Sequence, residues 1–511
     1  MTDIEATKRR RSGRREKLAQ RSAPPKANPC PPGQQGGQYR PLSDADCQSI
    51  YDTALRLLDD LGMGEVPDYL RDQLVAHGAR VKGDRVQMPP ALVQKAIAAA
   101  PGRFTLNGRD PARSIEVGGD RVHFGTGGAA VQILDVETGD YRPTTLQDLY
   151  DFTRLQDGLD NVSWFTRCCV ASDMPGEWLL DLNTVYALLR GTTRPVATSF
   201  TLAEHVSPII DMVELADGAG SFQRNPWIKA HISPVISPMR FGEDAVAVAL
   251  ECIRHNIPIS CITAAQSGAT APATLAGFLA QSLAETLASL VMVHVYAPGY
   301  PMVFSNWPLV IDLRTGAFCG GGGEISVMNA ASAQISNWLG LVSGVASSMT
   351  DAKALDAQYG MEKGISAMAA GLAGGNLIYE SAGMSASLLG ASFEAFLLDN
   401  DMLAHIYRAL RGVEVSQDTL GYDAIVEAVL GEGHFLGGMQ TMGAMERDYF
   451  YPAMADRDAP ISWSEKGRQD AWSRANAQVR DLLAKPDPGY LDAAADKRIR
   501  DKFDIRLGAA G

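Results

Sequence analysis

Short β-branched or apolar segments alternate with longer helical patterns from about residue 120 to residue 411, and this alternation constrains the fold more than any other feature of the sequence. The segments that predict strands are 121–126, 162–170, 194–200, 227–233, 258–263, 301–306, 343–349 and 375–380. The helical patterns among them are 174–190, 203–217, 241–255, 272–297, 324–340, 356–372 and 391–411. Eight strands that alternate with helices predict an α/β protein, a (β/α)8 TIM-type barrel, with a doubly wound sheet as the alternative.

The barrel pattern divides the chain into four predicted parts. Residues 1–40 predict a disordered tail, basic and proline-rich, because the run KRRRSGRREK has almost no apolar residue to bury. Residues 41–119 predict a helical cap with a short β pair near 80–88. Residues 120–455 hold the barrel, and residues 456–511 predict a charged helical extension that packs across its outside.

Charge and cysteine usage limit the partners and the compartment. The formal net charge is −13 although the first 17 residues are basic, and an acidic body argues against nucleic-acid binding. Seven scattered cysteines are an odd number, which fits a reducing cytoplasm better than a disulfide framework. The longest apolar stretch, around 287–297, falls short of the ~20 residues that span a bilayer, so we expect no membrane segment.

Several motifs suggest cofactors but lack the residues that would complete a site. FGTGGAA (124–130) has the glycine spacing of a dinucleotide loop, but strand and turn residues follow it where a helix is needed. The run Gly320–Gly323 lacks the Lys-Ser/Thr of a phosphate loop and predicts a close backbone approach instead. The eight histidines are isolated, and Cys252 and His255 have no second pair. We therefore expect no tightly bound metal or nucleotide.

Polar and aromatic residues gather where the predicted strands end. In a barrel these ends meet at one face, where chemistry takes place, so they predict a pocket. The residues are His231, Ser233, Thr263, Gln266, Ser305, Asn306, Trp307, Thr350, Asp351, Tyr379 and Glu380. In the following segment, 350–364, Gln358 and Glu362 share a helix face at i, i+4, although a solvated helix start explains that segment equally well.

Four segments resemble signatures of the trimethylamine:corrinoid methyltransferase family. They are TDAKALDAQYGMEKG (350–364), AGGNLIYESAGM (373–384), GHFLGGMQTM (433–442) and DYFYPAMADR (448–457), and the similarity extends over about 45–480. The resemblance implies a barrel enzyme that moves a methyl group from a methylated amine to the cobalt of a separate corrinoid-binding protein. It also implies a homo-oligomer, and it marks His434 as the titratable group of the C-terminal signature.

The sequence departs from the family at two positions. Members specific for trimethylamine carry pyrrolysine, whose position aligns near Glu380 or Ser381, and this chain has none. Gln440 stands where we expect histidine in many relatives. Members without pyrrolysine include glycine betaine methyltransferases. The resemblance therefore favours a small quaternary amine, glycine betaine or similar, over trimethylamine, and a quaternary nitrogen leaves as a neutral amine without a proton.

A quaternary ammonium has neither an N–H nor a lone pair, so cation–π contact and shape must recognise it. We expect substrate binding by the residues Trp307, Tyr359, Tyr379, His231, Gln358 and Asn306. The expected catalytic groups are Asp351, Glu362 and His434. The glycine run, His231 or Lys353 could hold a carboxylate.

Two other functions remain open from the sequence. One is a barrel lyase or aldolase that acts on a small carbonyl compound through a Schiff base on Lys353 or Lys363. The other is a non-catalytic protein that binds betaine or docks a corrinoid protein.

Overall fold

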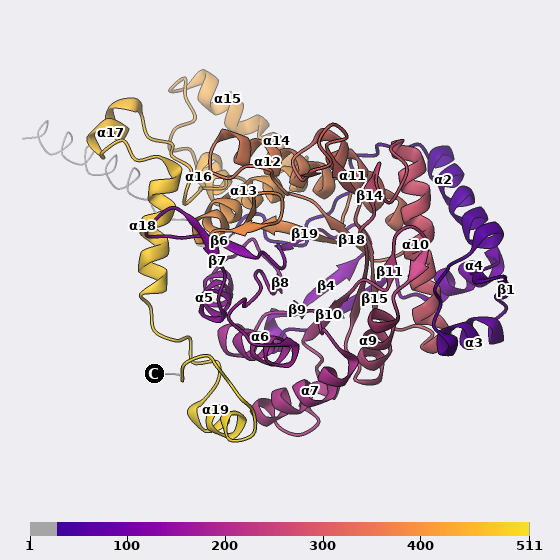
Figure 1. The fold of residues 1–511 in the computed structure, drawn as a ribbon. Coiled ribbons are helices and arrows are strands. Elements are labelled where there is room, and N and C mark those ends of the chain that lie inside the picture. Colours follow the sequence, from indigo (N-terminus) through magenta and orange to yellow (C-terminus); the bar gives the residue numbers. More distant parts are fainter. Residues whose placement is uncertain (1–27, 510–511) are drawn as a thin grey trace, which may run out of the picture.

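The computed structural model describes residues 28–509, and their centre is a closed barrel of eight parallel strands (Figure 1). The strand order is β5-β19-β18-β15-β13-β10-β9-β8, and a parallel bridge between Gly125 and Trp164 joins the two end strands. The predicted barrel is therefore confirmed over the doubly wound alternative. The strands are β5 (His123–Thr126), β8 (Phe165–Thr166), β9 (Val196–Thr198), β10 (Ile228–Ile232), β13 (Ile259–Thr263), β15 (Met302–Asn306), β18 (Ser343–Ala346) and β19 (Leu377–Ala382).

Helices surround the barrel, and each of the seven predicted helical patterns forms one of them. They are α6 (Glu177–Gly191), α7 (Ala203–Asp217), α9 (Glu243–Arg254), α10 (Leu275–Tyr296), α11 (Gly323–Trp338), α12 (Ala357–Leu372) and α13 (Phe393–Arg411). The sequence prediction missed α5 (Leu146–Asp157), which lies between β5 and β8. Its signal was a capping box, in which Thr145 and Asp148 satisfy each other's backbone N–H groups at the start of the helix.

The amino-terminal end of the barrel is closed. The hairpin β3 (Arg103–Leu106) and β4 (Ile115–Gly118) packs Leu106 and Val117 against Trp164, Val303 and Leu377 inside the barrel. A short turn, η2 (Pro111–Arg113), lies between these two strands. The opposite end, where the strands finish, is called the mouth below.

The predicted helical cap lies on one side of the barrel (Figure 1). Its elements are α2 (Asp44–Arg56), the π-helical turn η1 (Leu57–Leu61), α3 (Asp68–Ala76), β1 (Arg80–Lys82), β2 (Arg85–Gln87) and α4 (Pro90–Ala99). Between the cap and the barrel runs α10, the one helix of the described chain that is long and apolar enough to span a membrane. Because 83% of its apolar window is buried within the protein, its composition is that of a core helix.

Short strands in the loops surround the mouth. One group pairs β6 (Gln132–Leu134), β7 (Tyr141–Pro143), β20 (Met384–Ser385) and β21 (Gly390–Ala391). Another pairs β14 (Gln266–Ser267), β16 (Leu309–Ile311) and β17 (Phe318–Cys319), and a third pairs β11 (Val235–Ile236) with β12 (Arg240–Phe241). These loop sheets give the rim of the mouth a defined structure.

The two ends of the chain pack on the barrel's outside. Residues 28–40 of the predicted disordered tail are described, and they hydrogen-bond to the backbone near the start of β5, where Gly33 donates to Val122 and Val122 to Gln34. The rest of that predicted tail, residues 1–27, lies outside the described residues. At the other end, helix α18 (Ala471–Leu483) packs against α5 and α13, and α19 (Ala493–Arg500) packs against α7.

The chain after α13 forms a projection that we call the C-terminal lobe, residues 413–449. It contains α14 (Gln417–Leu420), α15 (Tyr422–Leu430) and α16 (Met439–Arg447). Barrel helices return to the amino-terminal side, and Arg411 at the end of α13 donates to the carbonyl of Pro29 there. The C-terminal helices that follow the lobe are α17 (Pro460–Glu465), α18 (Ala471–Leu483) and α19 (Ala493–Arg500), and α8 (Ser221–Arg224) is a short helix after α7.

Candidate active site

An aromatic cluster fills the barrel around Tyr379 of β19. The centroid of the Tyr379 ring lies 4.5 Å from that of Trp164, 4.8 Å from that of Trp307 and 5.1 Å from that of His231. Tyr379 is fully buried, whereas Trp307 and His231 are partly exposed. Trp307 and His231 are therefore the aromatic faces that a ligand entering through the mouth can reach, with Tyr379 as the support beneath them.

A lysine without a carboxylate partner lies under this cluster. The Nζ of Lys229 lies 2.7 Å from Nε2 of His231 and donates to the hydroxyl of Tyr379 at 2.7 Å, and that hydroxyl also contacts Ser260. Burial lowers the pKa of Lys229 well below its ordinary value. Burial also lowers the pKa of His231, and the positive charges of Lys229 and Arg167 lower it further. Burial therefore works against a positive charge on either base.

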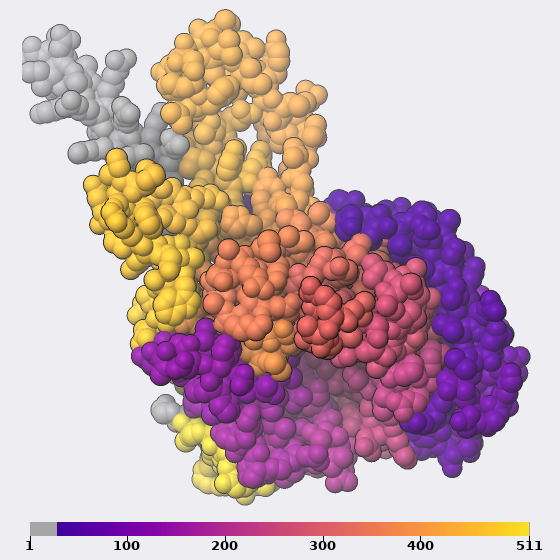
Figure 2. Space-filling model, turned by 45° about the horizontal axis from the view of Figure 1, so that its top comes forward, coloured from indigo at the N-terminus to yellow at the C-terminus, as the bar shows by residue number. Residues whose placement is uncertain are grey.

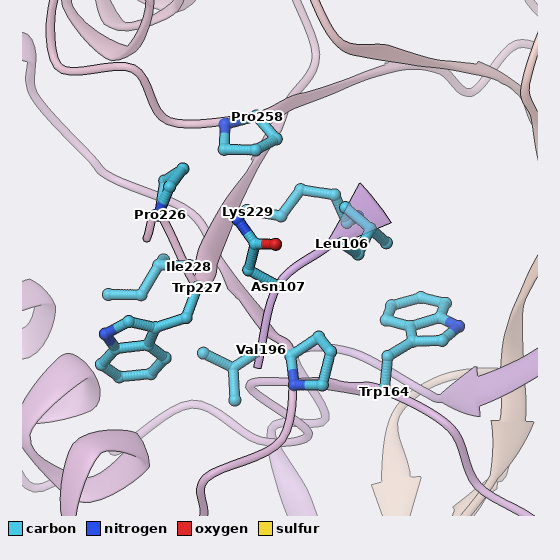
Figure 3. A pocket seen from close by; sticks show the side chains of 10 residues that line it. Leu106, Asn107, Trp164, Val196, Pro226, Trp227, Ile228, Lys229 and Pro258 are labelled. Carbon is cyan, nitrogen blue, oxygen red and sulfur yellow. The ribbon is translucent and has the colours of Figure 1, made fainter. Parts of the chain in front are cut away.

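The floor under Lys229 is closed to substrates. The cavity there has a volume of about 10 Å³ and is lined by Leu106, Asn107, Trp164 and Pro258 among others (Figure 3). A volume of this size holds about one water molecule. A small-molecule substrate must therefore reach the aromatic cluster from the mouth.

Arg167 follows β8 at the mouth and was not predicted as a site residue. No described residue forms a hydrogen bond or an ion pair with its side chain, and burial lowers the pKa of its guanidinium although Asp181 opposes this effect. Its charge reaches His231, whose pKa it lowers. A basic residue inside the predicted strand 162–170 was the available signal. An unpaired guanidinium near the mouth is a natural anchor for a ligand carboxylate.

Glu380 lies in the second half of β19 and has a strained backbone conformation. Its φ is +63°, and the pairing of β19 with β5 shifts register between Ile378 and Ala382. The Oε2 atom accepts a hydrogen bond from the Gly128 N–H at 3.2 Å, and a Cβ on Gly127 would lie 2.7 Å from the same oxygen. Burial raises the pKa of Glu380 to about 8, so this carboxyl is mostly protonated at neutral pH.

Three buried polar atoms at the mouth have no hydrogen-bond partner among the described residues. They are Oγ1 of Thr263 at the end of β13, Oδ1 of Asn306 at the end of β15, and Nε1 of Trp307 beside it. Buried polar groups are normally satisfied, so orphaned atoms gathered at two adjacent strand ends indicate where a ligand or ordered water binds.

Asp351 fastens loops together. Its carboxylate accepts hydrogen bonds from the N–H groups of Gly320 at 2.7 Å and Gly321 at 3.3 Å, and from the hydroxyl of Ser387 at 2.8 Å. Burial alone would raise the pKa of Asp351, but these hydrogen bonds outweigh it and lower the pKa. Two amides of the glycine run, those of Gly320 and Gly321, are thus already occupied by Asp351.

Glu362 and Gln358 belong to the same arrangement of loops. Glu362 accepts from the hydroxyl of Thr350 at 2.6 Å, from the N–H of Asp351 at 2.9 Å and from Nε2 of Gln358 at 2.9 Å. A Cβ on Gly321 would lie 2.2 Å from Cδ of Glu362. The close backbone approach predicted for the glycine run is therefore an approach to Glu362, and the geometry gives both predicted acids a tethering role at the rim.

Tyr359 lies behind the barrel wall, away from the aromatic cluster. Its hydroxyl donates to Asp399 of α13 at 2.7 Å, and Asp399 forms a 3.1 Å ion pair with Lys363 of α12. The side chains of Lys363 and Asp399 are 0% and 1% exposed. These contacts give Tyr359 no face for a substrate, and the contact with Asp399 holds Nζ of Lys363, which is therefore not free to attack a carbonyl.

The two other predicted groups are also outside the cluster. Lys353 is exposed and donates through Nζ to the carbonyl of Asp351. His434 lies in the C-terminal lobe, where its imidazole is about half exposed and Nε2 is 3.5 Å from Glu432. The structure thus gathers Trp307, Tyr379, His231 and Asn306 and separates His434 and Tyr359 from them. Within residues 28–509, no group of three or more His, Cys, Asp or Glu side chains could hold a metal ion.

Comparison with known proteins identifies the family to which the chain belongs. Residues 10–509 match the family described as trimethylamine methyltransferase (MTTB). The glycine betaine methyltransferase of Desulfitobacterium hafniense (strain Y51) is 25% identical over 468 residues, covering 92% of this chain and 97% of that protein.

Two relatives from Methanosarcina match over a similar share of their length. The trimethylamine methyltransferase MttB of Methanosarcina thermophila is 28% identical over 466 residues (90% of this chain, 95% of that protein), and that of Methanosarcina barkeri is 29% identical over 470 residues (90% and 94%). The chain therefore belongs to the trimethylamine methyltransferase family, a family of methyltransferases.

Proposed function

We propose that this protein transfers a methyl group from a small quaternary amine of the glycine betaine type to the cobalt of a corrinoid carried by a separate protein. The observation that carries the proposal is an aromatic site at the mouth, Trp307 and His231 over Tyr379, built on a buried lysine whose pKa is lowered by burial. Such a site suits a guest with a permanent positive charge. The similarity to a glycine betaine methyltransferase and the absence of pyrrolysine support the same substrate class.

Glycine betaine has two charged ends, and the mouth offers a group for each. The trimethylammonium end would lie against the indole of Trp307, because cation–π contact needs neither a donor nor an acceptor on the guest. The carboxylate would pair with Arg167, whose guanidinium has no partner among the described residues. We prefer Arg167 to the glycine run as carboxylate anchor, since Asp351 already accepts the N–H groups of Gly320 and Gly321.

The reaction itself asks little acid–base chemistry of the protein. The acceptor supplies the nucleophile, the carbon–nitrogen bond breaks in line with it, and the electron pair stays on nitrogen, which departs as a neutral tertiary amine. No proton has to move. The chain's residues therefore bind the cation, fix the direction in which one methyl group faces the mouth, and exclude water from it. All seven cysteines are free thiols, which fits the cytoplasm as the place of this reaction.

The test is a methyl-transfer assay with the full chain, reduced corrinoid and three amines: glycine betaine, tetramethylammonium and trimethylamine. We expect methylated corrinoid, followed by its absorbance, with glycine betaine and none with trimethylamine. Tetramethylammonium has the quaternary nitrogen without the carboxylate and should react more slowly. Ligand binding by calorimetry without methyl transfer would favour a sensing or docking protein, and turnover of trimethylamine alone would overturn the substrate class.

Replacing Trp307 with alanine should lower kcat/KM for every quaternary amine by a similar factor. A cation–π contact contributes about 0.5–2 kcal/mol, so kcat/KM should fall ~2- to 30-fold, and Trp307→Phe should retain part of the effect. The matched control is Trp472→Ala on α18, whose indole is 39% exposed and lies outside the aromatic cluster. Equal losses of kcat/KM in the two alanine variants would show that Trp307 does not bind the substrate.

Replacing Arg167 with methionine should lower kcat/KM only for substrates that carry a carboxylate. A hydrogen bond to a charged group contributes about 1.5–3 kcal/mol, so kcat/KM for glycine betaine should fall about 10- to 100-fold. The value for tetramethylammonium should hardly change, because that substrate has no carboxylate. Arg167→Lys keeps the charge and should recover part of the loss. A parallel loss with both substrates would show that Arg167 supports the fold and does not bind the carboxylate.

A further inference from the structure

Two basic side chains of β10 lie next to each other beneath the mouth. Lys229 and His231 are two residues apart on this strand, so they share its inner face, and Nζ of Lys229 is 2.7 Å from Nε2 of His231. Two positive charges at this separation repel each other too strongly to coexist in a buried site, so the pair takes up at most one proton. No carboxylate of the described chain forms an ion pair with either side chain, so no negative charge offsets that proton.

The proton on this pair and a cationic guest use the same aromatic rings. Nζ of Lys229 lies 4.9 Å from the centroid of the Trp164 ring and 4.8 Å from that of Tyr379, which are cation–π distances. The ring of His231 packs on Tyr379 at 5.1 Å and is one of the faces open to the mouth. A quaternary ammonium on that face therefore touches one member of the pair and shares the Tyr379 ring with the other.

We propose that a proton held by Lys229 and His231 and a quaternary ammonium ion are alternative ligands of this aromatic cluster, so that the guest binds tightly only after the proton leaves. The inference rests on the proposed function, because it takes the guest to be a quaternary amine. A second positive charge about 5 Å from the first weakens binding on the order of 100-fold at the effective dielectric constant of protein sites. Burial lowers the pKa of both bases, which makes the proton the ligand that gives way. Lys229 thereby sets the pH at which the site accepts a cation.

The other charged groups around the pair are few. Strands β9, β13 and β15 contain no charged residue. Arg167 faces His231 from the end of β8 and lowers the pKa of that ring, but a guanidinium keeps its charge at every pH used with proteins. Burial raises the pKa of Tyr379, so its phenol stays neutral. Glu380, the next residue on β19, does titrate near neutral pH, because burial raises its pKa to about 8.

The C-terminal lobe adds no titrating group to the cluster. It projects from the body in orange at the top of Figure 2, and its histidine, His434, lies beside Glu432 within the lobe. Glu380 is therefore the neighbour whose titration the experiment has to separate from that of the pair.

The experiment is isothermal titration calorimetry of the full chain with glycine betaine between pH 6 and 9, in two buffers that differ in ionisation enthalpy. We expect the affinity to rise with pH by up to about tenfold per pH unit until the pair has lost its proton, with about one proton released per guest on that slope. The matched control ligand is 3,3-dimethylbutanoate, in which carbon replaces the quaternary nitrogen. It keeps the shape and the carboxylate but has no positive charge, so its binding should release no proton.

Variants assign the proton to the pair. Lys229→Met should bind glycine betaine with equal affinity at pH 6 and 8.5, whereas Lys229→Arg, which keeps its charge, should bind weakly at both. Glu380→Gln removes the neighbouring titration and should keep the pH dependence of the unchanged protein. Lys95→Met, on an exposed position of α4, should keep it as well. Circular dichroism and urea unfolding check that each variant is folded.

Two results would overturn this proposal alone: glycine betaine binding with the same affinity at every pH, or a folded Lys229→Met that keeps the pH dependence. Absence of glycine betaine binding at any pH would overturn the proposed function and this proposal with it. The measurement in two buffers needs no variant, so it decides the question even if Lys229→Met does not fold.

Discussion

Replacing Asp399 with alanine should lower the free energy of unfolding by about 3–5 kcal/mol, because it leaves a buried charge without its partner. Asp399 accepts hydrogen bonds from the Tyr359 hydroxyl and the Gly383 N–H, both at 2.7 Å, and its carboxylate lies 3.1 Å from Nζ of Lys363. The two charged side chains are 0% and 1% exposed. Water cannot replace the lost carboxylate at this depth, so the ammonium of Lys363 remains uncompensated.

The measurement is urea unfolding followed by tryptophan fluorescence, with a double-mutant cycle. Lys363→Met alone should also destabilise, and Lys363→Met/Asp399→Leu should recover much of the loss, since apolar residues of similar volume often replace a buried pair without cost. The matched control is Asp501→Ala, which breaks the exposed i, i+4 pair with Lys497 and should change little. Additive losses in the double variant would show that the two side chains do not act as a pair.

Replacing Glu380 with glutamine should remove a pH dependence from the stability of the fold. Burial raises the pKa of Glu380 from 4.5 to about 8, so the folded state holds a proton that the unfolded state releases above pH 4.5. Stability is therefore full below pH 4.5 and is lost progressively as pH rises towards 8. At about 1.4 kcal/mol per pKa unit, the cost is ~3 kcal/mol at pH 7 and on the order of 5 kcal/mol above pH 8.

Glutamine keeps the shape of the protonated side chain and cannot ionise. Unfolding measured at pH 5, 7 and 8.5 should therefore give nearly equal stability for the unchanged protein and Glu380→Gln at pH 5, and an increasing advantage for the variant at higher pH. The control is Glu427→Gln on exposed α15, which should reproduce the slope of the unchanged protein. A variant that follows the same slope as the unchanged protein would show that Glu380 is ionised in the fold.

The sequence predicted the barrel well because its strands are buried on both faces. Runs such as Ile259–Thr263 and Met302–Asn306 then consist almost wholly of buried residues, and the helices between them carry their own apolar periodicity. The strand-end rule also located Trp307, His231 and Asn306 at the mouth, because parallel strands of a barrel finish at one face. It could not show that Tyr379 lies one layer deeper, since that depends on the stagger of the strands.

The predicted acids illustrate what spacing alone leaves undecided. Asp351 and Glu362 stand where a catalytic pair could stand, but their partners are backbone N–H groups and hydroxyls of neighbouring loops. Only the folded chain shows which donors reach them. The sequence analysis overlooked Lys229 and Arg167, because a single basic residue in or beside a predicted strand forms no recognisable motif. Their importance shows only in the folded chain, where Lys229 contacts Tyr379 and the Arg167 guanidinium has no ion-pair partner among the described residues.

The hairpin β3–β4 has a kinetic consequence. Under the proposed methyl transfer, a barrel sealed at one end gives the two substrates a single opening, so the small amine has to enter before a protein-sized acceptor covers that opening. The demethylated amine is then retained until the acceptor departs. Steady-state kinetics of such an arrangement are compulsory-order, with the amine as the leading substrate and its demethylated form as the last product released.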